Sequence, residues 1–381
     1  MHPIVIVGSG LAGYTLAREL RKLNKEIPIT IVTADDGRSY SKPLLSSALV
    51  SGKTPDQLAM ASAAQMAEQL KANIRTHTRV TTIAPAEHQI CLGEERVPYS
   101  ALVLALGAQQ RRPKLAGDGA EQIFSVNDLH DYARFRESLT HAKRVALIGA
   151  GLIGCEFAND LTSAGFRVQW VAWADVPLER LVPPQVSAGL PIALKVAGLE
   201  WHPQTSAVRA DRSAQGLCIT LANGTVLECD LALSATGLVP HTQLAVEAGL
   251  RVGRGIAVDR SLRSNVPNIY ALGDCAEVEG LVLPYVLPLM SQARALAKTL
   301  NGELTSVSYP VMPVVVKTPA YPIVAVPPLP SATGQWSVVT TEGGVRALFQ
   351  NSAGKLLGFA LGGTATAEKA TLAKQTPPIL S

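Results

Sequence analysis

The chain has 381 residues, of which 47% are hydrophobic and 17% charged, so it can bury large cores and is long enough for two or three domains. Its 34 basic and 30 acidic residues give a net charge of +4 without any basic tract, which argues against nucleic-acid binding. The longest uncharged run, residues 318–341, contains several prolines and is too broken to span a membrane.

The cysteines and the N-terminal segment are those expected of a protein in a reducing compartment. The five cysteines form no C-x-x-C pair and no metal-ligand spacing, so we expect neither a disulfide framework nor a metal site. The opening MHPIVIVGSG has no basic region before its apolar residues and enters a glycine-rich turn at once, unlike a signal peptide. We therefore expect a cytoplasmic protein without a membrane span.

Residues 4–23 predict a phosphate-binding turn between a strand and a helix. The β-branched run IVIV is followed by GSGLAG and then by leucines at helical spacing. In such a turn the first glycine allows a tight bend, the second lets a pyrophosphate approach the backbone, and the third lets helix and strand pack closely. The next strand ends in TADD, where an acid could bind a ribose. The residues expected to bind a dinucleotide here are Gly8, Gly10, Ala12, Gly13, Thr33, Ala34 and Asp35.

The same pattern recurs at RVALIGAGLIGCEFANDL, where Gly149, Gly151 and Gly154 form the turn and the following strand leads to Asp175. Two such units in one chain predict two bound dinucleotides, and the alternative is that both turns only pack helices on sheets. A 2′-phosphate would be repelled by Asp175, which favours NADH over NADPH, whereas Arg180 nearby would favour the opposite.

Later segments carry a family resemblance. ALVLALGAQ (101–109), DLALSATGLVP (230–240) and NIYALGDCAEV (268–278) each join an apolar strand to a glycine-containing end. With both turns they resemble the two-dinucleotide-domain flavoprotein reductases, and the order YSKPLLS, GLIGCEFANDL, NIYALGDCAEV, LPYVLPLM and VKTP is most similar to the rubredoxin and flavorubredoxin NAD reductases. This resemblance implies an FAD enzyme that takes a hydride from NADH and passes electrons singly to an acidic rubredoxin, as in alkane hydroxylation or the detoxification of oxygen or nitric oxide. Further cofactor contacts implied by the family are Ala105, Gly107, Gly237, Gly273, Asp274 and Pro288.

Two of these positions have a specific expected role. Asp274 resembles the carboxylate that binds the ribityl chain of FAD, although a turn cap would favour Asp equally well. The segment PLMSQARALAKTLNG predicts a helix with Pro288 near its first position. In the family this helix begins at the flavin, where its dipole would stabilise negative charge on the reduced ring.

Three charged residues are candidates for catalysis. The resemblance places Lys42 beside flavin N5, paired with Glu156 of the second glycine-turn helix, where the cation would polarise the position that receives hydride. A solvated lysine and a glutamate favoured by the helix dipole are the alternatives. Lys317, in VVVKTP, resembles a lysine that lies by the flavin, and its alternative role is to protect an edge strand. Ser46 and Ser47 stand where related enzymes keep a redox cysteine, so reduced flavin must discharge without a thiol.

The predicted fold is α/β: an FAD-binding domain of residues 1–112 and 241–308, an inserted NAD(H)-binding domain of 113–240, and a small α+β C-terminal domain of 309–381. Five short strands and a final helix near 366–374 are expected in the last domain. Two alternative functions stay open. One is a ferredoxin reductase of an oxygenase system, because acceptor choice depends on surface charge. The other is a redox-sensing protein in which NADH reduces FAD mainly to change conformation.

Overall fold

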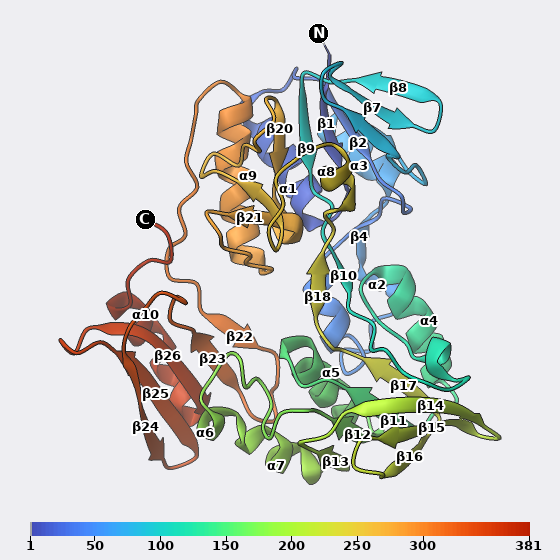
Figure 1. Ribbon diagram of the computed structural model, residues 1–381, viewed down its shortest axis with the longest axis vertical. Coiled ribbons are helices and arrows are strands. Elements are labelled where there is room, and N and C mark those ends of the chain that lie inside the picture. The colour runs from blue at the N-terminus through green and yellow to red at the C-terminus, as the bar shows by residue number, and fades with distance from the viewer. Residues whose placement is uncertain (1) are drawn as a thin grey trace.

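The computed structural model describes residues 2–381, which are organised around three larger β-sheets (Figure 1). The first sheet is parallel, with strand order β20-β9-β1-β2-β5. Its strands are β1 (Ile4–Val7), β2 (Ile29–Val32), β5 (Asn73–Arg75), β9 (Ala101–Leu104) and β20 (Ile269–Ala271). Because β20 pairs with β9, this sheet combines chain segments from before and after the second sheet. Strands β1, β2 and β9 are buried along their whole length, as expected for a parallel sheet covered on both faces.

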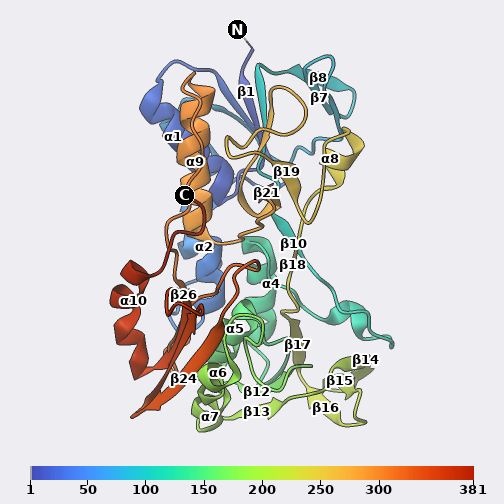
Figure 2. The same cartoon turned by 60° about the vertical axis from the view of Figure 1, so that its left-hand side comes forward.

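Helices α1 (Leu11–Leu23) and α9 (Val286–Leu300) run side by side in the first domain (Figure 2). Smaller elements complete it: α3 (Ala63–Leu70), α8 (Gln243–Glu247), the antiparallel strands β6 (Thr82–Ala84), β7 (Gln89–Leu92) and β8 (Glu95–Pro98), and the parallel pair β19 (Ile256–Val258) and β21 (Ala276–Val278). Helix α9 begins at Val286, and Pro288 is its third residue, so it lies near the first position as predicted. Proline is tolerated throughout the first turn because those N–H groups have no acceptor within the helix.

Two antiparallel strands, β10 (Ala108–Gln110) and β18 (Leu238–Pro240), cross between the first and second domains (Figure 1). The second sheet is again parallel, with order β13-β12-β11-β17. It contains β11 (Arg144–Ile148), β12 (Arg167–Val171), β13 (Leu199–His202) and β17 (Leu231–Ser234), accompanied by α4 (Leu129–Leu139), α5 (Leu152–Ser163), α6 (Pro184–Ser187), α7 (Gly189–Lys195) and the antiparallel strands β14 (Ala207–Ser213), β15 (Gly216–Leu221) and β16 (Val226–Cys229). The predicted pair of dinucleotide-binding folds is confirmed.

The C-terminal domain is one antiparallel sheet with order β22-β23-β26-β25-β24. Its elements are β22 (Val314–Val316), β23 (Ile323–Val326), β24 (Gln335–Thr341), β25 (Gly344–Gln350), β26 (Leu356–Gly363) and, after a 3-10 turn, α10 (Lys369–Gln375). The five predicted strands and the final helix are therefore present. The division into residues 1–112 with 241–308, 113–240 and 309–381 stays a prediction at the level of individual boundaries.

One hydrophobic core joins all three domains. It includes Leu45 from the 3-10 helix η1 (Lys42–Ser47) of the first domain, Phe157 and Leu161 from α5, and Val316 and Ile323 from the C-terminal sheet. Apolar contact of this kind holds the domains together through burial from water, at roughly 25 cal/mol for each Å² of apolar surface. Among residues 2–381, no helix is long and apolar enough to cross a membrane.

Candidate functional site

In the first glycine turn, two glycines are required by close contacts within the protein and the third is not. A Cβ on Gly8, which has φ +116°, would lie 2.3 Å from the carbonyl oxygen of Ala105. A Cβ on Gly13 would lie 1.9 Å from the carbonyl oxygen of Gly8, so helix α1 packs on β1 only without a side chain there. Gly10 differs: its φ is −63°, and a Cβ would meet nothing within 4 Å. The open space at Gly10 is the place where a pyrophosphate would approach the N-terminus of α1.

The second turn repeats this geometry. A Cβ on Gly149, which has φ +108°, would lie 2.5 Å from the carbonyl oxygen of Ala235, and one on Gly154 would lie 2.2 Å from that of Gly149. A Cβ on Gly151 would again have open space around it. Since the middle glycine of each turn has no protein contact that requires it, both turns have the open shape that a phosphate cradle needs.

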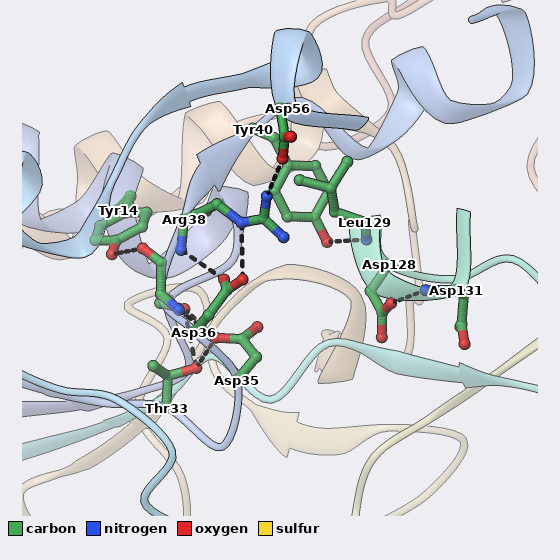
Figure 3. A network of polar contacts seen from close by, with 12 residues as sticks. Tyr14, Thr33, Asp35, Asp36, Arg38, Tyr40, Asp56, Asp128, Leu129 and Asp131 are labelled. Carbon is green, nitrogen blue, oxygen red and sulfur yellow. Dashed lines mark hydrogen bonds and ion pairs between the residues drawn. The ribbon is translucent and has the colours of Figure 1, made fainter. Parts of the chain in front are cut away.

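The loop after β2 is held by the carboxylate of Asp35 (Figure 3). Asp35 Oδ1 accepts hydrogen bonds from Thr33 Oγ1 at 2.6 Å, the backbone N–H of Gly37 at 2.9 Å and Ser9 Oγ at 3.1 Å. One oxygen of Asp35 is thus committed to the protein, and the other is free to accept a hydrogen bond from a ribose hydroxyl. Ala34, between Thr33 and Asp35, is exposed in this loop.

Tyr40 connects this loop region to the second domain. Its hydroxyl accepts the backbone N–H of Leu129 at 3.3 Å, in the first turn of α4 (Figure 3). Burial raises the pKa of Tyr40, and nearby Asp128 raises it further, so the hydroxyl stays neutral. The loop that follows Asp35 is therefore fixed against the inserted domain.

Asp175 lies exposed beyond the end of β12, and its backbone oxygen accepts a hydrogen bond from Trp201 Nε1 at 3.3 Å. Its carboxylate has no ion pair among the described residues. Arg180 forms no ion pair with Asp175, and its guanidinium lies 5.5 Å from the centre of the Trp173 ring.

Gly273 and Asp274 follow the end of β20 and lie in the short 3-10 helix η3 (Gly273–Cys275). Gly273 has φ +78°, and its N–H donates to Gln292 Oε1 of α9 at 2.6 Å, so α9 fixes this turn. Burial raises the pKa of Asp274, and the charge of Lys42 opposes this rise. Ala12 closes the other side of the turn, since a Cβ on Gly273 would lie 2.8 Å from Ala12 Cβ.

Gly107 and Gly237 flank the crossing strands β10 and β18. Both have positive φ, +68° and +109°, and a Cβ on either would meet nothing within 4 Å. Their backbone conformation therefore explains these glycines. No contact shows whether Gly107, Gly237 or Pro288 touches a cofactor, and these assignments stay predictions.

The predicted pairing of Lys42 with Glu156 was wrong. Lys42 Nζ instead donates to Asn127 Oδ1 at 3.2 Å, and Asn127 Nδ2 donates to the carbonyl of Ala108 at 2.9 Å. Glu156 is paired with Lys317, whose Nζ lies 2.9 Å from Glu156 Oε2. The C-terminal domain supplies a nearer cation than η1 does, and a carboxylate buried this deeply needs a cation in contact.

Ser46 belongs to the same group of contacts. Its hydroxyl donates to Glu156 Oε2 and accepts from Lys317 Nζ at 3.0 Å, while Lys317 Nζ also donates to the carbonyl of Pro43. The position where related enzymes carry a redox cysteine is thus a hydrogen-bonding residue between three domains.

The buried cysteines are not reactive thiols. All five are free, and burial raises the pKa of Cys275 to about 12 and that of Cys155 well above its usual range. Buried thiols of this kind stay protonated and inert. Among residues 2–381 there is also no cluster of side chains that could hold a metal ion.

Sequence reasoning missed two residues that position the predicted ones, Asn127 and Gln292. Asn127 is 85 residues from Lys42, and Gln292 is 19 residues from Gly273. The contact of Asn127 with Lys42 forms only when the first and second domains pack, whereas the contact of Gln292 with Gly273 joins α9 to η3 within the first domain. The buried polar glutamine in the apolar stretch of α9 was the one available signal.

Comparison with known proteins gives the family. Residues 2–297 match the model of the pyridine nucleotide-disulphide oxidoreductases, and residues 306–376 match that of the rubredoxin binding C-terminal domain. The chain belongs to the pyridine nucleotide-disulphide oxidoreductase family, among its rubredoxin-NAD(+) reductases. It is 50% identical to a rubredoxin-NAD(+) reductase of Alcanivorax borkumensis over 100% of both chains. It is 46% identical to that of Acinetobacter baylyi over 100% of this chain and 99% of the relative. The predicted resemblance is confirmed.

Among solved structures, a ferredoxin reductase from Rhodopseudomonas palustris is similar in fold, with a TM-score of 0.88 and 25% identity over 99% of this chain and 96% of the other. The reductases therefore share one architecture, including the position of the C-terminal domain. The family membership supports a dinucleotide-dependent oxidoreductase, which agrees with the two cradles found in the structure.

Proposed function

We propose that the chain binds FAD at the first glycine turn and NADH at the second, and passes electrons from NADH through FAD to a rubredoxin. The observation that carries this proposal is the pair of turns whose middle glycines, Gly10 and Gly151, face open space rather than protein. The rubredoxin-binding match over residues 306–376 supports the choice of acceptor. Bound flavin would supply the conversion of a two-electron hydride into single electrons.

In this proposal the residues around the flavin position have distinct tasks. Asp274, with its raised pKa, would accept hydrogen bonds from the ribityl hydroxyls, which satisfy its lone pairs where water is excluded. Lys42 carries the positive charge that this buried carboxyl senses, and it would stabilise negative charge that develops during hydride transfer. Asn127 holds the Lys42 ammonium in place.

In the second domain, the N–H groups at the start of α5 would bind the pyrophosphate of NADH. The exposed carboxylate of Asp175 would bind the adenosine ribose and repel a 2′-phosphate. The C-terminal domain would receive the rubredoxin. Ser46, at the position where the family resemblance would place a redox cysteine, carries no thiol, so reduced flavin would pass its electrons outward.

The test is anaerobic stopped-flow mixing of the FAD-loaded, NADH-reduced protein with rubredoxin or with a ferredoxin. We expect rubredoxin to reoxidise the flavin much faster, at a rate that falls as salt screens the attraction between partners. Faster reoxidation by ferredoxin would identify the protein as a ferredoxin reductase. Slow reoxidation by both acceptors would favour the redox-sensing alternative.

A further inference from the structure

Helix α5 carries three buried polar side chains along one face. Glu156, Asn159 and Asp160 are spaced i, i+3, i+4 and are only 3%, 5% and 3% exposed. Polar side chains so far from water are tolerated only when their hydrogen-bonding atoms have partners. Their partners therefore indicate what this face of the helix does.

Two of the three residues hold the C-terminal domain. Glu156 Oε1 accepts the backbone N–H of Lys317 at 3.2 Å, and Asn159 Oδ1 accepts that of Ala320 at 3.1 Å. Both N–H groups belong to the loop between β22 and β23, which are the first two strands of the rubredoxin-binding domain in chain order. This loop is thus fixed to α5 at two points along its backbone.

The third residue holds the segment that carries Lys42. Asp160 Oδ2 accepts the N–H of Leu49 and Oδ1 that of Val50, each at 3.0 Å, two and three residues after the end of η1. Burial raises the pKa of Asp160, while these two N–H donors lower it by binding the charged form. Asn127 holds η1 at its start and Asp160 just beyond its end.

Apolar packing continues the same arrangement, because Phe157 and Leu161 of α5 lie in one core with Leu45 of η1 and with Val316 and Ile323 of the C-terminal sheet. Helix α5 also begins at the glycine turn of the second domain, with Gly151 as its N-cap. One helix therefore contacts the proposed pyrophosphate site at its N-terminus and both neighbouring domains along its side.

We propose that Asn159 is a positioning residue for electron exit, and that it acts by fixing the loop at Ala320 and so the orientation of the rubredoxin-binding domain. Asp160, one residue further, fixes η1 and so the lysine that serves hydride entry. The adjacent side chains of Asn159 and Asp160 then affect different half-reactions, Asn159 the reoxidation of flavin by rubredoxin and Asp160 the reduction of flavin by NADH. This inference rests on the proposed function of the chain.

The experiment compares Asn159→Ala with wild type, using rubredoxin and ferricyanide as alternative acceptors. Ferricyanide is small and takes electrons without docking on the C-terminal domain. Alanine preserves the helix but leaves the Ala320 N–H without its acceptor, and we expect kcat/KM for rubredoxin to fall by about 5- to 10-fold. The ferricyanide rate and the KM for NADH should stay within about 2-fold of wild type, since no contact to the glycine turn is lost. Ser163→Ala is the matched control, because it removes the other partner of Asn159, at 3.5 Å, and keeps the bond to Ala320.

Asp160→Asn provides the contrast. An amide would turn one N–H donor toward the backbone N–H of Leu49 or Val50 and so loosen η1. Flavin reduction by NADH should then slow, and turnover should fall with rubredoxin and with ferricyanide alike. Hydrogen exchange adds a measure independent of activity: Asn159→Ala should speed exchange at Ala320 and leave Leu49 and Val50 protected.

Unchanged rubredoxin kinetics in Asn159→Ala would overturn the inference, as would equal losses with rubredoxin and ferricyanide. Fast exchange at Ala320 in the wild-type protein would overturn it without any variant. Failure of the proposed function looks different, because the wild-type protein itself would then not reduce rubredoxin.

Discussion

Replacing the second and third glycines of the GSGLAG turn separately, as Gly10→Ala and Gly13→Ala, distinguishes a ligand site from a packing site. A Cβ at position 13 would lie 1.9 Å from the carbonyl oxygen of Gly8, where ordinary contact begins at 3.4 Å, so α1 would have to move away from β1. Overpacking of this severity costs about 1–3 kcal/mol or more, a large share of a typical stability of about 5–15 kcal/mol.

Position 10 has no such conflict, since a Cβ there meets nothing within 4 Å and φ is −63°. Alanine is a poorer N-cap than glycine, which lowers stability by several tenths of a kcal/mol, but it also reduces the entropy of the unfolded chain, which raises stability by about 0.4–1 kcal/mol. The free energy of unfolding of the apoprotein should therefore change by less than about 1 kcal/mol. FAD affinity should nevertheless fall by at least about 30-fold, or ~2 kcal/mol, because the methyl group occupies the space of the pyrophosphate.

The assay is urea unfolding of each apoprotein together with titration by FAD. Gly151→Ala is the matched control, because it places the same methyl group in the second turn and should weaken NADH binding while leaving FAD binding intact. Wild-type FAD affinity in Gly10→Ala would refute the reasoning. Loss of stability in Gly10→Ala equal to that in Gly13→Ala would refute it as well.

Three further substitutions test the assigned roles. Lys42→Ala should slow flavin reduction by NADH while FAD stays bound, measured by stopped flow, since the residue supplies charge rather than packing. Asp175→Ala should raise the KM for NADH and narrow the preference over NADPH, measured by steady-state kinetics with both nucleotides. Asp274→Asn should stabilise the apoprotein at neutral pH and weaken FAD binding, measured by thermal unfolding at several pH values and by FAD titration.

The sign for Asp274 follows from proton linkage. Its pKa is raised in the folded chain above the ordinary 3.8, so the folded state binds more protons than the unfolded state between the two values. Stability of the wild-type apoprotein therefore falls as pH rises above 3.8, and the loss persists above the folded pKa. Asparagine removes this loss, so the two proteins should converge in acid. Equal stability of wild type and Asp274→Asn at neutral pH would contradict the role assigned to Asp274. Loss of FAD in Lys42→Ala would contradict the role of Lys42, and unchanged kinetics in Asp175→Ala would contradict that of Asp175.

The fold was predictable because its determinants are local. A β-branched strand followed by a glycine turn and an amphipathic helix specifies each dinucleotide-binding unit, and Gly8 and Gly13 are needed at their positions by contacts within a few residues or in the adjacent strand. The short strands of the C-terminal domain were visible for the same reason, because each is an apolar run within one segment of the sequence.

The partners of charged residues were not predictable in this way. Glu156 pairs with Lys317, 161 positions later, because the C-terminal sheet packs against α5, whereas the family resemblance assigned Lys42 as its partner. Asn159 and Asp160 likewise find their partners in other domains. Long-range polar contacts depend on how domains dock, which no local pattern encodes.

The measurement that tests the central claim most directly is an anaerobic titration of the FAD-loaded protein and excess rubredoxin with NADH. The account predicts that each NADH reduces two rubredoxin molecules, that the rate depends on bound flavin, and that blocking thiols with an alkylating reagent changes nothing. A purified protein that cannot take up flavin, or that consumes NADH without reducing rubredoxin, would contradict it.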